Sequence, residues 1–170
     1  MSKSLTIRAA SPDDSMAYET FMSNIFAENL DTLCPRVQQP TPEQVHTWMS
    51  SHTGESSVVL FATCEEQLLG TLILSRFARP NMDHTVGLGL NVRADSRGKG
   101  VGRALLKAGI AWFEQAAAIE RIELEVMSHN ASALHLYSTF GFAQEGRKIG
   151  AIKKGNQYLD LIVMGLRKHG

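Results

Sequence analysis

The chain has 170 residues, a length at which one domain with a single core is common, and we expect one domain over residues 1–170. Hydrophobic residues make up 44% and charged residues 20% of the chain, which excludes a disordered or fibrous protein. Seventeen basic residues balance seventeen acidic residues, so the net charge favours neither a nucleic acid nor an anionic membrane as a partner.

The first part of the chain shows one strand pattern followed by two helix starts. Residues 4–10 alternate apolar and polar side chains with the period of a strand. A serine N-cap and a proline at residues 11–12 then begin a helix, which we expect to run to about Asn29. By the same logic a second helix should begin after residues 40–43 and end near residues 52–54.

Three β-rich runs follow these helices. The first two are separated only by residues 65–67, which indicates an antiparallel hairpin. The expected strands are residues 57–64, 68–77 and 84–92. Because a hairpin requires antiparallel pairing, a mixed α/β domain fits this order better than a doubly wound parallel sheet.

The second half alternates between helix and strand. Apolar residues recur with helical period from Gly100 onwards, and the next strand places Glu123 and Glu125 on the face opposite its apolar residues. The remaining elements are expected to be a strand at 121–127, a helix at 131–140, and two strands at 143–152 and 158–166 joined by residues 153–156.

The sequence carries no sign of a targeting segment or of a metal site. Residues 1–16 contain no apolar run of signal-peptide length, and no later stretch approaches the roughly 20 apolar residues of a membrane helix. Cys34 and Cys64 lack the spacing of a zinc site or a disulfide framework. We therefore expect a cytoplasmic protein with reduced thiols, no metal and no membrane partner.

A glycine-rich turn opens the helix that begins near residue 100. It reads Arg97-Gly98-Lys99-Gly100-Val101-Gly102 and is followed by Arg103. Glycines let backbone N–H groups approach a ligand, and a helix N-terminus offers unpaired N–H groups and the positive end of the helix dipole. With the basic side chains, this arrangement favours a ligand that carries several phosphates.

The glycine spacing disfavours two common phosphate sites. The dinucleotide fingerprint fails because its third glycine would fall on Arg103 or Leu105, and a P-loop fails because Lys99 is followed by glycine rather than Ser or Thr. On the residues alone, a turn that merely caps a helix remains an alternative.

Two signatures in register resemble those of the GNAT acetyltransferase superfamily. The segment Arg97-x-x-Gly100-x-Gly102 resembles its pyrophosphate loop, Arg/Gln-x-x-Gly-x-Gly/Ala. A second family signature is matched downstream by Asn130-x-x-Ala133-x-x-x-Tyr137-x-x-x-Gly141-Phe142. Residues 155–160 are similar to bacterial members that acetylate amino acids, small amines or protein N-termini. The first 55 residues match only in outline.

The resemblance implies a fold and a cosubstrate. The fold is a mixed, mostly antiparallel sheet of about seven strands, with helices on both faces and a V-shaped splay between the fourth and fifth strands. The cosubstrate is acetyl-CoA, whose pantetheine arm would lie along the backbone of Leu90, Asn91 and Val92. Its pyrophosphate would be held by Arg97, Gly98, Lys99, Gly100, Gly102 and Arg103. Asn130 would contact the arm, and its position also suits a helix N-cap.

The chemistry needs a proton acceptor and a proton donor. An amine with a pKa of roughly 10 must lose a proton before it attacks the thioester. Some family members carry a glutamate on the fourth strand, but here that strand carries no acid and only His84 at its start. Glu123 and Glu125 are therefore the candidate bases and would act through water. The alternative is that they are ordinary ion-pair partners. Tyr137 shares a helix face with Asn130 and would protonate the leaving thiolate, or else it is a packed aromatic.

Several assignments remain open at this level. Asp160 meets the ammonium of the acceptor or braces the sheet, and residues 28–39 are expected to shape the acceptor site. The acceptor is an amino acid, a small amine or a peptide N-terminus. Exposed terminal strands make a homodimer plausible. The alternatives to an enzyme are an acyl-CoA sensor without catalysis and a structural module.

Overall fold

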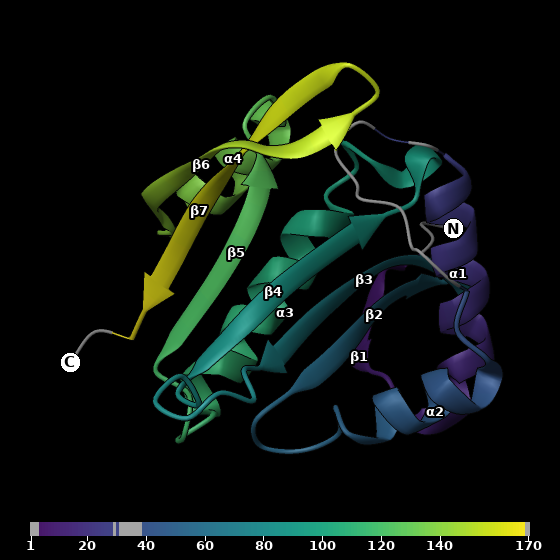
Figure 1. Cartoon of the computed structure of the whole chain (residues 1–170). Coiled ribbons are helices and arrows are strands. Elements are labelled where there is room, and N and C mark those ends of the chain that lie inside the picture. The colour runs from purple at the N-terminus through teal and green to yellow at the C-terminus, as the bar shows by residue number, and fades with distance from the viewer. Residues whose placement is uncertain (1–3, 29, 31–38, 169–170) are drawn as a thin grey trace.

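The computed structural model describes residues 4–28, 30 and 39–168 (Figure 1). Cys34 and most of the segment expected to shape the acceptor site lie outside the described residues. The described strands form one seven-stranded sheet in the order β1-β2-β3-β4-β5-β7-β6. Only β4 and β5 pair in parallel, and the other neighbours are antiparallel. The strands are β1 Thr6–Ala9, β2 Val58–Cys64, β3 Gln67–Arg76, β4 Thr85–Val92, β5 Arg121–Met127, β6 Ala143–Lys154 and β7 Gln157–Arg167.

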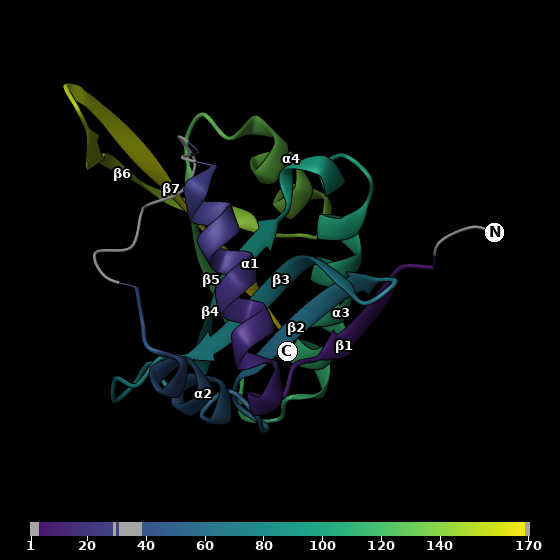
Figure 2. The same cartoon turned by 90° about the vertical axis from the view of Figure 1, so that its right-hand side faces the viewer.

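Helices cover both faces of the sheet (Figures 1 and 2). They are α1 Ser15–Ala27, α2 Pro42–Ser50, α3 Val101–Gln115 and α4 Ala131–Thr139. Alternate residues of β2 divide between two hydrophobic clusters: Leu60 packs with α3 and Phe61 with α1 and α2. The continuous apolar run Val58–Ala62 therefore serves two cores, one on each face of the sheet. None of the helices in the described part of the chain has the length and apolar character that a membrane crossing requires.

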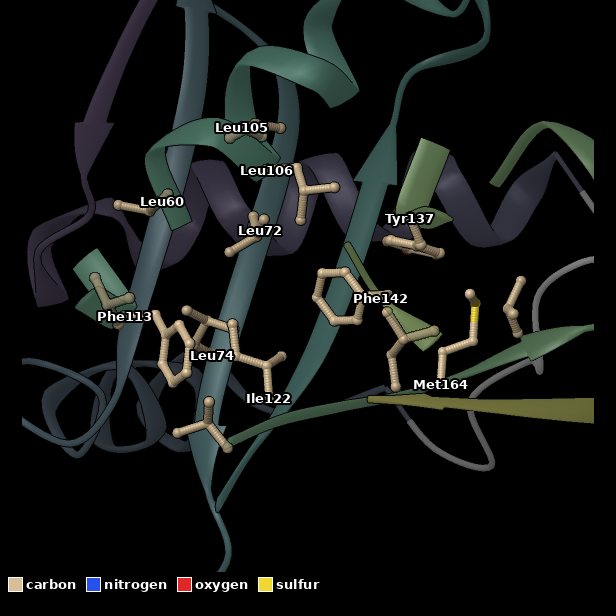
Figure 3. Packing of buried hydrophobic residues seen from close by; sticks show 14 of the residues in the cluster. Leu60, Leu72, Leu74, Leu105, Leu106, Phe113, Ile122, Tyr137, Phe142 and Met164 are labelled. Atoms are coloured by element: carbon tan, nitrogen blue, oxygen red, sulfur yellow. The ribbon is translucent and has the colours of Figure 1, made fainter. Parts of the chain in front are cut away.

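The larger cluster lies between α3 and the centre of the sheet (Figure 3). A Cβ atom on Gly109 would lie 2.9 Å from Leu72 Cδ2, so this glycine lets α3 sit directly on β3. The same cluster continues through Ile122 of β5 to Tyr137 of α4 and to Phe142, which follows α4. One continuous core therefore fixes α3 and α4 relative to the two strands between which the sheet opens.

The parallel pairing of β4 with β5 is short. Thr85, Val86 and Gly87 pair with Arg121, Ile122 and Glu123, and no further pair forms. Beyond this point β4 stays paired with β3 up to Val92, while β5 stays paired with β7 up to Met127. The two strands therefore diverge, as Figure 1 shows, which confirms the V-shaped splay. Above this point the facing edges of β4 and β5 have no partner among the described strands.

The first helix begins later than predicted. Residues 12–14 form a 3₁₀ turn, and α1 starts at Ser15 instead of Pro12. The carboxylate of Asp14 accepts a hydrogen bond from the backbone N–H of Ser11 at 2.8 Å and pairs with Arg8. These contacts hold the first turn in the tighter form. The second helix begins at Pro42, within the segment 40–43 after which it was predicted to begin, and Thr41 is its N-cap. It ends at Ser50, two residues before the predicted end.

Both hairpin turns are tighter than predicted. Only Glu65 and Glu66 connect β2 to β3, both with positive φ (48° and 65°), which suits the twist of a two-residue turn. The turn between β6 and β7 consists of Gly155 and Asn156 alone. The two lysines assigned to that turn from the sequence instead extend β6.

Candidate active site

A cavity of about 640 Å³ occupies the opening between β4 and β5. Its walls come from the part of β4 that has left β5, from the glycine-rich turn before α3, from α4, and from the C-terminal end of α1. The lining residues on the strand and turn side are Leu88, Gly89, Leu90, Asn91, Val92, Arg97, Gly98, Gly100, Gly102 and Arg103. Those on the opposite side and at the end are Glu125, Val126, Asn130, Ser132, Ala133, His135, Leu136, Tyr137, Ile25 and Leu30.

Most of the residues singled out from the sequence therefore meet in one place. Ten of the eleven candidate cofactor-binding residues line the cavity, and Lys99 is the exception. Of the three candidate catalytic residues, Tyr137 and Glu125 line the cavity and Glu123 does not. Ile25 also lines the cavity, although no motif marks it, because α1 reaches the cavity only through the tertiary fold. Leu30, from the segment 28–39 that was expected to shape the acceptor site, lines it as well.

The glycines of the turn serve different purposes. Gly98 and Gly100 have φ of +70° and +85°, and a Cβ atom on either would have no heavy atom within 4 Å. Their backbone conformation, rather than crowding by protein atoms, therefore favours glycine. Gly100 is the N-cap of α3 and provides no side-chain cap, so the first N–H groups of the helix are left for another acceptor.

Arg97 is oriented by two acceptors. Its Nε donates to the carbonyl oxygen of Val92 at 2.9 Å, and its Nη2 donates to the carboxylate of Glu28. The guanidinium of Arg103 lies 5.5 Å from the centre of the Phe140 ring, a cation–π contact. Two cations thus border the N-terminus of α3, where the helix dipole also favours an anion.

Asn130 caps α4. Its Oδ1 accepts a hydrogen bond from the backbone N–H of Ala133 at 3.2 Å, which confirms the N-cap role. Its side-chain NH₂ has no hydrogen-bond partner within the described part of the chain. The cap fixes the side chain at the cavity wall while two N–H donors remain available.

Tyr137 is 6% exposed, and its ring packs against Phe142 with 5.7 Å between ring centres. Burial raises the pKa of its hydroxyl to about 12, because the phenolate would be poorly solvated there. The hydroxyl has no protein hydrogen-bond partner among the described residues. A protonated phenol therefore borders the cavity at neutral pH.

The two glutamates of β5 have different surroundings although they share a strand face. Glu125 lies beyond the point where β4 departs and pairs with Lys148 of β6. Glu123 lies at the last paired position and binds Arg121 at 3.0 Å. Arg121 also binds Glu145, and this contact lowers the pKa of the Glu145 carboxyl.

Asp160 braces the outer hairpin. Its Oδ1 accepts from the backbone N–H of Gly150 at 2.7 Å, and its Oδ2 accepts from Arg147 Nε at 2.7 Å. These bonds lower the pKa of the Asp160 carboxyl and hold the bulge of β6 between Lys148 and Ile152. Of the two roles left open from the sequence, the contacts match the brace. His84 precedes β4 at the closed end of the V and does not line the cavity.

The chain is similar to known acetyltransferases. The model of the acetyltransferase (GNAT) domain matches residues 7–163. The L-amino acid N-acetyltransferase AaaT of Escherichia coli (strain K12) is 26% identical over 135 residues, which are 79% of this chain and 83% of that protein.

Two solved structures share the fold. A GNAT-family acetyltransferase of Streptococcus pneumoniae superposes with a TM-score of 0.90 at 23% identity, covering 96% of this chain and 99% of that one. The Salmonella typhimurium protein yncA, solved with its cofactor acetyl-CoA, superposes with a TM-score of 0.85 at 21% identity, covering 97% and 95%. Together with the family match over residues 7–163, the cavity and its glycine-rich turn show that the chain belongs to the GNAT acetyltransferase family and is an acetyl-CoA-dependent N-acetyltransferase.

Proposed function

We propose that the cavity holds acetyl-CoA and a primary amine together and that the amine attacks the thioester directly. The observation that supports this is the convergence of a phosphate-suited turn, an unpaired strand edge, a protonated phenol and a carboxylate on one cavity. A cytoplasmic location, as expected from the sequence, is part of this proposal, because acetyl-CoA and small amines are both present there.

Acetyl-CoA would enter from the side of the glycine-rich turn. The pyrophosphate would accept from the free N–H groups at the start of α3, with Arg97 and Arg103 adding charge. Lys99 does not line the cavity, so its contribution would be longer-range attraction. The pantetheine arm would bind along the edge of Leu90 to Val92 that faces β5, where β4 has no strand partner among the described residues. The amide of Asn130 would donate from the opposite wall.

The chemical steps follow from the groups at the inner part of the cavity. Glu125, through water, accepts a proton from the ammonium of the acceptor, and the free amine forms a bond to the thioester carbon. A backbone N–H on the open edge of β4 stabilises the oxyanion. As the C–S bond breaks, Tyr137 donates its proton to the sulfur, and the nitrogen of the intermediate loses its remaining extra proton, which restores the phenol through water. The proton first taken by Glu125 is released to solvent. The ion pair of Glu123 with Arg121 favours the alternative that Glu123 is an ordinary ion-pair partner and not a base.

The acceptor that fits best is a free amino acid. Glu125 lines the cavity and forms an ion pair with Lys148, which is not itself a lining residue, and the two side chains are 39% and 53% exposed. Such exposed pairs contribute only about 0–1 kcal/mol, so a zwitterion can exchange with the pair at little cost, its ammonium on Glu125 and its carboxylate on Lys148. The name of the E. coli relative supports the same class of acceptor.

We also propose that two copies associate through the outer hairpin. Ile149 is 85% exposed and Tyr158 is 65% exposed. Both belong to the β6–β7 hairpin, which projects from the body in Figure 2, and β6 is an edge strand of the sheet. An exposed edge that carries large apolar side chains favours pairing with another chain.

Replacing Gly100 tests the phosphate cradle. Gly100→Val should abolish measurable acetyl-CoA binding, because the branched side chain would occupy the space where the ligand approaches the backbone. The matched control is Gly155→Val, which places the same side chain at a φ of +59° in an open turn. Both variants carry strain of about 1–2 kcal/mol, so calorimetry should separate loss of binding from loss of stability. Wild-type affinity in a folded Gly100→Val protein would contradict the cradle.

Tyr137→Phe tests the proton donor. It should keep acetyl-CoA affinity but lower kcat by roughly 10- to 1000-fold, the range for loss of a general acid. Because the pKa of Tyr137 is raised to about 12, the wild-type phenol stays protonated from pH 7 to 10, and its ionisation should cause no loss of kcat there. Tyr158→Phe is the matched control. A kcat within about twofold of wild type in Tyr137→Phe would assign the proton to another donor.

Lys148→Ala tests the acceptor class in an assay that measures release of free thiol from acetyl-CoA. The same assay on wild type distinguishes an enzyme from a protein that only binds acyl-CoA. The substitution should lower kcat/KM for amino acids by about 10- to 100-fold, as expected for loss of a charged hydrogen bond. Aliphatic amines and polyamines, which have no carboxylate, should be unaffected. Lys153→Ala, on the same hairpin with its cation over Tyr158, is the control. An equal loss for every amine would remove the proposed carboxylate contact.

Light scattering tests the homodimer. The chain has a mass of 18.7 kDa, so a dimer has twice that mass, about 37 kDa. Wild-type protein should show the dimer mass, and Ile149→Ser with Tyr158→Ser should reduce it to the monomer mass, because these changes remove the exposed apolar area. A monomer in the wild-type sample would exclude the proposal.

A further inference from the structure

One side chain joins the end of α1 to the segment that follows β4. Glu28 directly follows α1, and its backbone N–H still donates to the carbonyl oxygen of Asn24 at 3.2 Å. Its carboxylate binds Arg97, which lies 69 residues away in the sequence, and accepts from the backbone N–H of Ala94 at 3.3 Å. In Figure 1 the upper end of α1 lies beside the segment beyond the tip of β4.

These contacts leave Arg97 in a restricted orientation. Its Nε is committed to the carbonyl oxygen of Val92 and one Nη2 hydrogen to Glu28. Within the described residues no acceptor binds Nη1, and Arg97 lines the cavity. The side chain is thus held at two points while the N–H groups on its other edge remain for a ligand.

Such restraint favours binding. An arginine that is free in solution must be ordered when it binds a phosphate, and ordering one flexible side chain costs about two- to tenfold in affinity. Here the ordering cost is met when the protein folds. The carboxylate of Glu28 has the opposite effect, because it repels the pyrophosphate. That repulsion is weakened because Glu28 is neutralised by Arg97 and accepts a hydrogen bond from the N–H of Ala94.

We propose that Glu28 is a positioning residue for acetyl-CoA, which orients Arg97 toward the pyrophosphate and fastens the end of α1 to the phosphate-binding turn. This inference rests on the proposed use of Arg97. It adds a residue that no motif marks, and it links the acetyl-CoA end of the cavity to the helix that contributes Ile25 to its wall.

A double-mutant cycle tests the coupling. Calorimetry would measure acetyl-CoA affinity in wild type, Glu28→Ala, Arg97→Ala and the double variant, with thermal unfolding as a control for folding. Each single substitution should weaken binding by about three- to tenfold, and the double variant should bind within about twofold of Arg97→Ala. The same loss should appear in the KM for acetyl-CoA with kcat nearly unchanged. Glu28→Gln, which keeps one of the two acceptor contacts, should lie between wild type and Glu28→Ala.

The outcomes separate this inference from the proposed function. Glu114→Ala removes the same charge from the exposed side of α3 and should leave affinity unchanged. If wild type fails to bind acetyl-CoA, or Arg97→Ala has no effect, the proposed site itself is wrong. Glu28 does not position Arg97 if Arg97→Ala weakens binding but the losses of affinity from the two single variants add fully in the double variant. The same conclusion follows if Glu28→Ala or Glu28→Gln binds acetyl-CoA more tightly than wild type.

Discussion

The parting of β4 from β5 beyond Gly87 and Glu123 is the constraint on which the site depends. Each strand remains fully paired on its other side, so the sheet opens without losing its remaining ladders. The opening leaves backbone groups of β4 without strand partners, and buried groups of this kind need an acceptor or donor from elsewhere. A ligand with an amide-bearing arm meets that requirement, and the sheet then gains what resembles an added strand.

The surrounding packing keeps this opening in place. Tyr137 and Phe142 belong to the same core cluster as α3 and β5, so this wall of the cavity is anchored to the main core. On the other face, α1 is held by its own cluster with α2, and its end reaches the cavity. The site therefore joins two cores that the sheet otherwise separates. We accordingly expect a contact across it, such as that of Glu28 with Arg97, to affect both the acetyl-CoA end and the acceptor end of the cavity.

Segments that lie close together along the chain could be singled out from the sequence. The glycine-rich turn follows from its glycine spacing, whereas Asn130 and Tyr137 were singled out through the resemblance to the GNAT signatures, and their spacing places both on one helix. The alternation of residues along β5 placed Glu123 and Glu125 on one face. Their surroundings differ because β4 departs between them, and tertiary packing rather than local sequence determines that point. The pairing of Glu28 with Arg97, the contribution of α1 to the cavity and the 3₁₀ turn before α1 depend on long-range or side-chain contacts that no local pattern encodes.

Hydrogen exchange of the backbone amides, with and without acetyl-CoA, tests most directly whether the opening between the strands is the binding site. We expect slower exchange in those amides of residues 88–92 that face β5 and are not paired with β3, and in residues 97–103 at the start of α3, with little change in the outer hairpin at residues 143–167. Slowing confined to other segments, or none at saturating acetyl-CoA, would contradict it.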